Sequence, residues 1–312
     1  MNFLEFSKLF PTEESIIDYI IHNVYHDEIK CPHCGKSHKI YREHNEKARM
    51  KVLHCGNCNY SFSIFKNTIF EKSDTDLRKW FYAINLALVS KKGISALQLK
   101  REIGVTYKTA WRMMKQIRTA MGNAENQQLF EALVEIDETY VGGKPRKDNH
   151  NDQDDDAPKT PNKRGRGTRK TPVVGVKERN SNRVYAQVAL PNKEGKCLSG
   201  KQLFKILDKV CKDSTTVMTD DFRGYNFLDH KNSRNFVRIS VNHSMGEFSK
   251  GNGIHTNGIE SFWAVLKRGV YGIYHHISVK YMQKYIDEFC FRSNNRDEFA
   301  FDKLVCQCMG VR

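Results

Sequence analysis

Apolar residues recur at helical spacing in the N-terminal third of the chain. Within residues 1–30 the stretch 15–21 suits a short amphipathic helix. Three further helices are predicted over 73–88, 95–103 and 106–121, and Gly104 separates the last two. The first of these three opens with Ser-Asp-Thr-Asp, an acidic start typical of a helix N-terminus.

From Leu129 onward the pattern changes to a mixture of strands and helices. Apolar runs predict strands at 133–137, 171–176, 183–190 and 215–220. A polar stretch from Lys144 to Lys170, with an acidic block followed by a basic block, predicts a mobile loop between the first two strands. We therefore expect an α/β domain over 126–312, preceded by a helical domain over 73–125 and a small domain over 1–72.

Composition narrows the class of protein. The chain has 312 residues and a net charge of +15, which indicates a polyanionic partner. A hydrophobic fraction of 39% can build a core and excludes wholesale disorder. No apolar run reaches the roughly 18 residues that cross a bilayer, and the first residues lack a secretory pattern, so we expect a cytoplasmic protein without a membrane partner. Nine cysteines, an odd number in such a protein, argue against a disulfide scaffold.

Two cysteine pairs predict a metal site in the first domain. Cys31 and Cys34 form one C-x-x-C turn, Cys55 and Cys58 form another, and 20 residues lie between the turns. This spacing is typical of a structural zinc ribbon with four thiolate ligands, and Gly56 would supply backbone freedom in the second turn. Bound zinc would then provide much of the folding energy of so small a segment. The alternative is four buried thiols without a metal.

Residues 91–120 are strongly basic, with eight Lys or Arg against the single acid Glu102. Their pattern resembles a helix-turn-helix, in which Leu97, Leu99 and Ile103 of the first helix would face a core. We expect the second helix to bind DNA, and its candidate contact residues are Tyr107, Lys108, Arg112 and Lys115. An ordinary solvated pair of basic helices is the alternative.

Carboxylates stand on three predicted elements of the last domain. Strand alternation places Glu135 and Asp137 on one face and Glu138 on the other. A second strand ends in Asp220 and Asp221, and a helical stretch carries Glu260. Such a set fits a site for magnesium ions that acts on phosphodiesters. These acids also have simpler interpretations: the aspartates could cap a helix, and Glu260 with the asparagine three residues before it could form a capping box.

The order of these features resembles DDE transposases of bacterial insertion sequences, in the group that has an N-terminal zinc ribbon and is related to Merlin transposases. The resemblance extends from about residue 18 to residue 296. Beyond the cysteine pairs and basic helices, three blocks carry it: Ile136-Asp-Glu-Thr-Tyr-Val-Gly-Gly-Lys, Thr219-Asp-Asp-Phe-Arg-Gly-Tyr, and His255-Thr-Asn-Gly-Ile-Glu-Ser-Phe-Trp-Ala-Val-Leu-Lys-Arg.

The resemblance implies a ribonuclease H-like catalytic domain that cuts and joins DNA with Mg²⁺ or Mn²⁺. It assigns Asp137, Asp220 and Glu260 as the catalytic, metal-binding acids. Members of this group also use asparagine at the third position, so Asn257 is an alternative for part of that role. Lys267 lies seven residues beyond Glu260, on the same helical face, where it could contact the DNA backbone.

The same resemblance implies particular partners. They are double-stranded DNA, both the terminal inverted repeats of a transposon and a target, and further copies of this chain in a homodimer or larger synaptic assembly. Two rival functions remain open: a DNA-binding regulator derived from a transposase that has lost its chemistry, and a plain nuclease or resolvase of the same fold.

Overall fold

The structure is a computed structural model, and its chain divides into two compact units. One unit comprises residues 1–124 and 295–312, and the other comprises residues 125–294. The residues that the structure describes are 1–42, 52–123, 129–142, 170–181, 183–191, 198–230, 233–241, 255–296 and 300–310.

The first unit is mainly helical. Its elements are α1 (Phe3–Leu9), α2 (Glu13–Asn23), β1 (Ile40–Arg42), β2 (Leu53–Cys55), β3 (Tyr60–Phe62), α3 (Leu77–Val89), α4 (Ala96–Ile103), α5 (Tyr107–Asn123) and α9 (Ala300–Cys308). The predicted helix at 15–21 is confirmed within α2, and the helices predicted at 95–103 and 106–121 are confirmed as α4 and α5.

Aromatic side chains from distant parts of the sequence form the core of this unit. The ring of Phe81 on α3 lies 5.4 Å from that of Phe10 and 6.0 Å from that of Phe301 on α9. Burying such rings is a large part of the free energy that stabilises a small helical unit. The C-terminal helix therefore packs with the N-terminal residues, whereas the sequence suggested that 126–312 form a single domain.

Local capping explains where the helices of this unit begin and end. Asp76 accepts a hydrogen bond from the backbone of Arg78 at 2.7 Å, so α3 begins at Leu77 and not at the predicted Ser73. Gly104 ends α4 with φ of 61°, a left-handed conformation that favours glycine. One expectation is wrong: Leu97, predicted to face a core, is 47% exposed.

The second unit is built around one sheet. Its elements are β4 (Leu133–Val141), β5 (Thr171–Glu178), β6 (Val184–Val188), α6 (Gly200–Val210), β7 (Thr216–Asp220), the 3₁₀ helix η2 (Arg223–Asp229), β8 (Val237–Val241), α7 (Asn257–Gly269), the π-helical turn η4 (Val270–Tyr274) and α8 (Val279–Asn294). All four predicted strands are confirmed, and β8 was missed.

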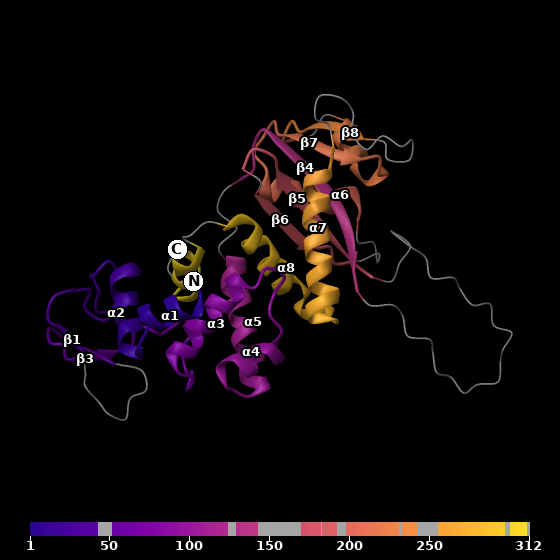
Figure 1. Cartoon of the computed structure of the whole chain (residues 1–312). Coiled ribbons are helices and arrows are strands. Elements are labelled where there is room, and N and C mark those ends of the chain that lie inside the picture. The colour runs from indigo at the N-terminus through magenta and orange to yellow at the C-terminus, as the bar shows by residue number, and fades with distance from the viewer. Residues whose placement is uncertain are drawn as a thin grey trace, which may run out of the picture. The chain divides into compact units, whose positions relative to one another are not determined.

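The sheet has five strands in the order β6-β5-β4-β7-β8. The pairs β6–β5 and β5–β4 are antiparallel, whereas β4–β7 and β7–β8 are parallel. Alternation along β4 directs Val134 and Ile136 to the core shared with α6, and a separate core on the opposite face contains residues of α7 and α8. Figure 1 shows α7 lying across the sheet.

Gly175 on β5 allows α7 to approach the sheet. A Cβ atom at this position would lie 2.6 Å from the ring of Trp263 and 2.9 Å from Ile259, both on α7. We expect Gly175→Ala to cost about 1–3 kcal/mol of stability through overpacking and to lower the melting temperature. Gly272→Ala is the control, because nothing lies within 4 Å of the added carbon. Equal melting temperatures for the two variants in thermal unfolding would contradict this account.

The predicted loop at 144–170 lies, apart from Lys170, outside the described residues. In the part of the chain that the structure describes, no helix combines the length and apolar character needed to cross a membrane.

Candidate functional site

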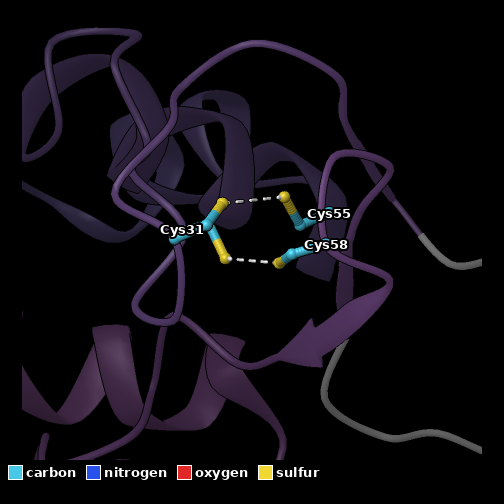
Figure 2. A group of neighbouring side chains, drawn as sticks. Cys31, Cys55 and Cys58 are labelled. Atoms are coloured by element: carbon cyan, nitrogen blue, oxygen red, sulfur yellow. Dashed lines mark hydrogen bonds between the residues drawn. The ribbon is translucent and has the colours of Figure 1, made fainter.

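Four thiols converge in the first unit. Cys31 and Cys34 lie before β1, Cys55 ends β2, and Cys58 lies in the turn to β3. Their Sγ atoms all lie within 4.8 Å of one another, with Cys31 to Cys58 at 3.6 Å and Cys34 to Cys55 at 3.7 Å. Figure 2 shows the labelled sulfurs directed towards a common centre. A tetrahedral zinc ion with Zn–S bonds of about 2.3 Å separates its sulfurs by about 3.8 Å, so these four cysteines could hold zinc.

The turns around these thiols favour ligation. Burial opposes ionisation of Cys55, but hydrogen bonds from the backbone amides of Asn57 and Cys58 and from the thiols of Cys34 and Cys31 together outweigh it and lower the pKa of Cys55 to about 6. The left-handed positions are Gly35 and Asn59, with φ of 72° and 60°. The role predicted for Gly56 needs correction: it provides space, because an added Cβ would lie 3.1 Å from the ring of Tyr41.

The carboxylates of β4 have different environments. Both oxygens of Glu135 are occupied: Oε1 lies 2.8 Å from Nε of Arg179, and Oε2 accepts the backbone N–H of Ile259 at 2.8 Å. Glu138 points to the opposite face, where it accepts a hydrogen bond from the hydroxyl of Tyr225 at 3.1 Å. Asp137 faces α7 and accepts one hydrogen bond at Oδ2, from the indole of Trp263 at 3.1 Å.

Asp137 and Asp220 lie on adjacent parallel strands. The strand pairing runs from Leu133 with Thr216 to Glu135 with Met218, and continuing this register brings Asp137 level with Asp220. Asp220 also accepts a hydrogen bond from the backbone of Phe222 at 3.0 Å, so its interpretation as a local cap holds in part. The next residue, Asp221, is exposed.

The environment of Asp137 opposes its negative charge. Burial is the largest cause, and the charges of Glu138 and Asp220 add to it, so the pKa of Asp137 rises to about 7 from an ordinary value near 4. A divalent cation between the carboxylates of Asp137 and Asp220 would relieve this repulsion, and such oxygen donors suit Mg²⁺ or Mn²⁺.

This raised pKa predicts a pH-dependent stability. The carboxyl ionises near pH 4 in the unfolded chain and near pH 7 in the folded chain, so its charge destabilises the fold increasingly as pH rises through that window. In buffer without Mg²⁺ or Mn²⁺, we expect Asp137→Asn to stabilise the protein at pH 8 by about 1–4 kcal/mol. Thermal unfolding should show this gain shrinking as the pH falls towards 4. A gain in stability that is equal at pH 4 and pH 8, or that Asp221→Asn also produces, would contradict the raised pKa of Asp137.

The third proposed acid lies on α7. Glu260 is exposed, and its Oε1 accepts a hydrogen bond from the hydroxyl of Thr256 at 3.0 Å. The alternative capping box between Asn257 and Glu260 is not what the structure shows, because Thr256 is the N-cap residue and Asn257 already belongs to the helix. Lys267, two turns on from Glu260, is exposed as well.

The three acids do not gather as closely as the thiols. Among the described residues, the four cysteines are the one group of three or more possible ligands whose donor atoms all lie within 4.8 Å. Asp137 and Asp220 are neighbours on the sheet, and α7 contacts β4 and β5 on the face towards which Asp137 points. Glu260 precedes Trp263 by three positions on this helix, which places the two side chains on neighbouring parts of its surface.

The proposed DNA-contacting residues fall into two groups. Tyr107, which is 51% exposed, and Lys108, which is also exposed, lie on the first turn of α5. Lys115 lies over the ring of Trp111 at 5.5 Å. Arg112 turns inwards: it donates to the hydroxyl of Ser73 at 3.1 Å, and its guanidinium lies 5.6 Å from the ring centre of Trp80. The structure therefore gives Arg112 a packing role.

Sequence reasoning assigned no role to Arg179 or Trp263. Trp263 lies three residues after Glu260, and this helical spacing was an available signal that it shares the side of α7 that carries the acid. Arg179 follows β5 in a polar turn, and nothing in its local sequence distinguishes it from other surface arginines.

Comparison with known proteins identifies the family. Residues 129–294 match the ISXO2-like transposase domain. The chain is 30% identical over 264 residues to an uncharacterised protein in the transposable element ISH50 of Halobacterium salinarum, and the match covers 84% of each chain.

Solved structures give weaker similarities. The Mos1 transposase paired-end complex with its left transposon end matches at 13% identity and a TM-score of 0.28, over 74% of this chain and 79% of that one. The simian T-cell lymphotropic virus intasome in complex with a PP2A regulatory subunit matches at 12% identity and a TM-score of 0.30, over 65% and 66% of the two chains. These TM-scores are too low to establish a shared fold. The sequence matches, by contrast, span more than half of the chain, and the protein belongs to the DDE transposases of insertion sequences, in the ISXO2-like group.

Proposed function

We propose that this protein is an active, metal-dependent transposase that binds the terminal inverted repeats of its element, cleaves the DNA and joins the freed ends to a target. The observation that carries the proposal is that Asp137 and Asp220 lie on the adjacent parallel strands β4 and β7, while α7, which carries Glu260, packs against β4 on the face towards which Asp137 points. The elevated pKa of Asp137 supports it, because perturbed carboxylates are concentrated at functional sites.

The residues present fit a divalent cation. Asp137, Asp220 and Glu260 would hold it, with Asn257 as the alternative donor on α7, and bound Mg²⁺ or Mn²⁺ would supply Lewis-acid stabilisation of charge on the phosphodiester. The protein's own task is to keep these oxygens on a rigid sheet and helix. The exposed amine of Lys267 would contact the DNA backbone on the same helix.

We also propose finer names for the folds. The strand order, with three antiparallel strands followed by two parallel ones, agrees with a ribonuclease H-like domain. Helices α4 and α5, joined through the left-handed Gly104, agree with a helix-turn-helix whose second helix presents Tyr107 and Lys108 to DNA. Together with the cysteine turns they would recognise the transposon ends, in a homodimer or larger synaptic complex acting on cytoplasmic, nucleoid DNA.

Product analysis tests this function. Purified protein is incubated with a labelled DNA that contains the element's end, a supercoiled target plasmid and Mg²⁺. We expect both cleaved ends and covalently joined products. Cleavage without joining would favour the nuclease or resolvase alternative, and binding without cleavage would favour a regulator that has lost its chemistry.

A pair of substitutions on α5 tests the DNA-contacting surface. Lys108→Ala should weaken binding to end DNA and reduce the slope of log affinity against log salt by about 0.9, the value for one lost phosphate contact. Arg112→Ala should instead lower the melting temperature, because it removes a hydrogen bond to Ser73 and a cation–π contact with Trp80. Fluorescence anisotropy at several salt concentrations and thermal unfolding measure the two effects. The opposite pattern would place Arg112, and not Lys108, at the DNA.

A further inference from the structure

We propose that Glu135 is a positioning residue, which caps the N-terminus of α7 from the neighbouring strand and thereby sets where Glu260 lies relative to Asp137. This inference rests on the proposed function for the part that concerns metal binding. The cap itself can be tested without any metal or DNA.

The helix lacks a local cap. Its N-cap residue Thr256 makes no side-chain hydrogen bond to the backbone of the first turn, and its hydroxyl donates to Glu260 instead. The first N–H groups of a helix have no partner within the helix, and a buried helix start must find acceptors elsewhere. Here the N–H of Ile259 donates to Oε2 of Glu135 at 2.8 Å, across 124 positions of sequence. The acceptor that a capping residue normally supplies therefore comes from β4.

The carboxylate of Glu135 is built into the fold. Its residue is only 1% exposed, and a buried charge is tolerated when it is paired and hydrogen-bonded. Nε of Arg179 lies 2.8 Å from Oε1, and the same guanidinium donates to the backbone oxygen of His255 and lies 2.9 Å from its Nδ1. The positive end of the helix dipole adds a further favourable interaction. Glu135 and Arg179 thus hold the residues immediately before and within the first turn of α7.

The first turn of α7 packs closely against the carboxylate of Glu135. A Cβ atom at Gly258 would lie 2.7 Å from Oε2 of Glu135, so this first turn approaches the carboxylate as closely as a residue without a side chain permits. Lys177, the cross-strand partner of Glu135, also donates to the backbone oxygen of Gly258 at 3.3 Å. The turn is held from β4 and β5 at once, and Glu260 follows the capped amide directly.

The consequence for the proposed site is geometric. Asp137 lies two positions after Glu135 on the same face of β4, and Trp263 of α7 donates to Asp137. The helix is therefore tied to one strand face at two levels, by Glu135 at its first turn and by Asp137 one turn further on. Loss of the contact with Glu135 would let the first turn of α7 fray and Glu260 move, while Asp137 and Asp220 keep their places on the sheet.

The sheet supplies a matched control in Glu178. This glutamate is also buried, accepts a backbone N–H, that of Glu131, at 2.7 Å, and pairs with an arginine, Arg183, at 3.6 Å. Within the described part of the chain, its hydrogen bonds and ion pair involve neither α7 nor Asp137. Glu135→Ala and Glu178→Ala should therefore cost similar stability, and only the first should affect α7. Glu135→Gln keeps an oxygen for the N–H of Ile259 and provides a variant with a milder defect.

The experiment has two readouts on the intact chain. Hydrogen exchange of residues 257–263, without divalent ions other than zinc, should quicken at least about tenfold in Glu135→Ala, less in Glu135→Gln, and not in Glu178→Ala. Binding of Mn²⁺, measured by calorimetry, should weaken about 10–100-fold in Glu135→Ala, the range typical of residues that orient metal ligands. Unchanged exchange in Glu135→Ala would overturn the cap. Faster exchange with unchanged Mn²⁺ affinity would overturn the positioning role.

The two proposals fail differently. If the unaltered protein neither bound Mn²⁺ at this site nor joined DNA, the proposed function would be wrong, and the exchange rates would still decide whether Glu135 caps α7. If the unaltered protein did both and Glu135→Ala behaved like Glu178→Ala in every readout, the function would stand and this inference would be wrong.

Discussion

Asp137→Asn and Asp220→Asn are each expected to abolish strand transfer by the purified protein while leaving its binding to end DNA intact. Each substitution keeps the shape of the side chain and removes one carboxylate from the pair on β4 and β7. Removing a residue that orients a metal ligand typically lowers metal affinity or activity about 10–100-fold. Loss of a direct ligand should therefore lower the activity by more than that range. The measurement is the initial rate of formation of joined products at saturating Mg²⁺.

Asp221→Asn is the matched control for this loss. It alters the same type of side chain at the adjacent position, but Asp221 is exposed and lies beyond the end of β7. We expect it to retain most of the activity. Wild-type rates in Asp137→Asn and Asp220→Asn would remove the metal site from the proposal and leave a DNA-binding protein.

Removal of zinc should have the second large effect, on the cysteine module formed by residues 31–62. Structural zinc contributes about 10–16 kcal/mol in zinc-finger peptides, and the short strands β1, β2 and β3, of three residues each, offer little else to hold the module together. We expect one zinc per chain by elemental analysis. Cys55→Ser or treatment with a chelator should unfold the module, seen as fast hydrogen exchange over 52–62, and leave strands β4 to β8 and helices α7 and α8 protected.

The half-buried Cys306 provides the control for the zinc experiment, because it lies on α9 and outside the thiol group. Cys306→Ser should keep its zinc. If the unaltered protein contained no metal and a chelator changed nothing, the alternative of four unligated thiols would be correct.

Short-range sequence patterns correctly predicted the cysteine turns and most of the helices and strands. Each C-x-x-C spacing places the two sulfurs of its own turn within reach of one ion, because the two-residue gap and the tight turn are local properties. The four sulfurs meet because β1 pairs with β2 in the folded chain. Helices α2, α4 and α5 followed from their apolar periodicity, and α4 ended where Gly104 offered the left-handed conformation. Strand β8 was missed although Val237-Arg-Ile-Ser-Val alternates apolar and polar residues. It is a short edge strand of five residues, and its first residue, Val237, is 55% exposed.

Glu135 and Asp137 differ in ways that their local sequence does not reveal. Strand alternation placed Glu135 and Asp137 on one face, and it could not rank them; the family resemblance did so. Their difference lies in contacts across the fold: Arg179 and the backbone of Ile259 occupy both oxygens of Glu135, whereas Asp137 accepts the indole N–H of Trp263 and is repelled by the charge of Asp220. Arg112 is a similar case, because its basic neighbours on α5 suggested DNA while Ser73 and Trp80 engage it from within.

The sequence by itself thus determined the zinc-binding spacing, most of the helices and strands, the basic character of α4 and α5, and, through its motifs, the transposase family. Only the tertiary structure decided that Asp137 and Asp220 lie on adjacent parallel strands, that Glu135 caps α7, and that α9 packs beside α3. The reason is physical. Periodicity and turn chemistry act over a few neighbouring residues, whereas pairing of strands, pairing of buried charges and packing of rings depend on which distant segments meet.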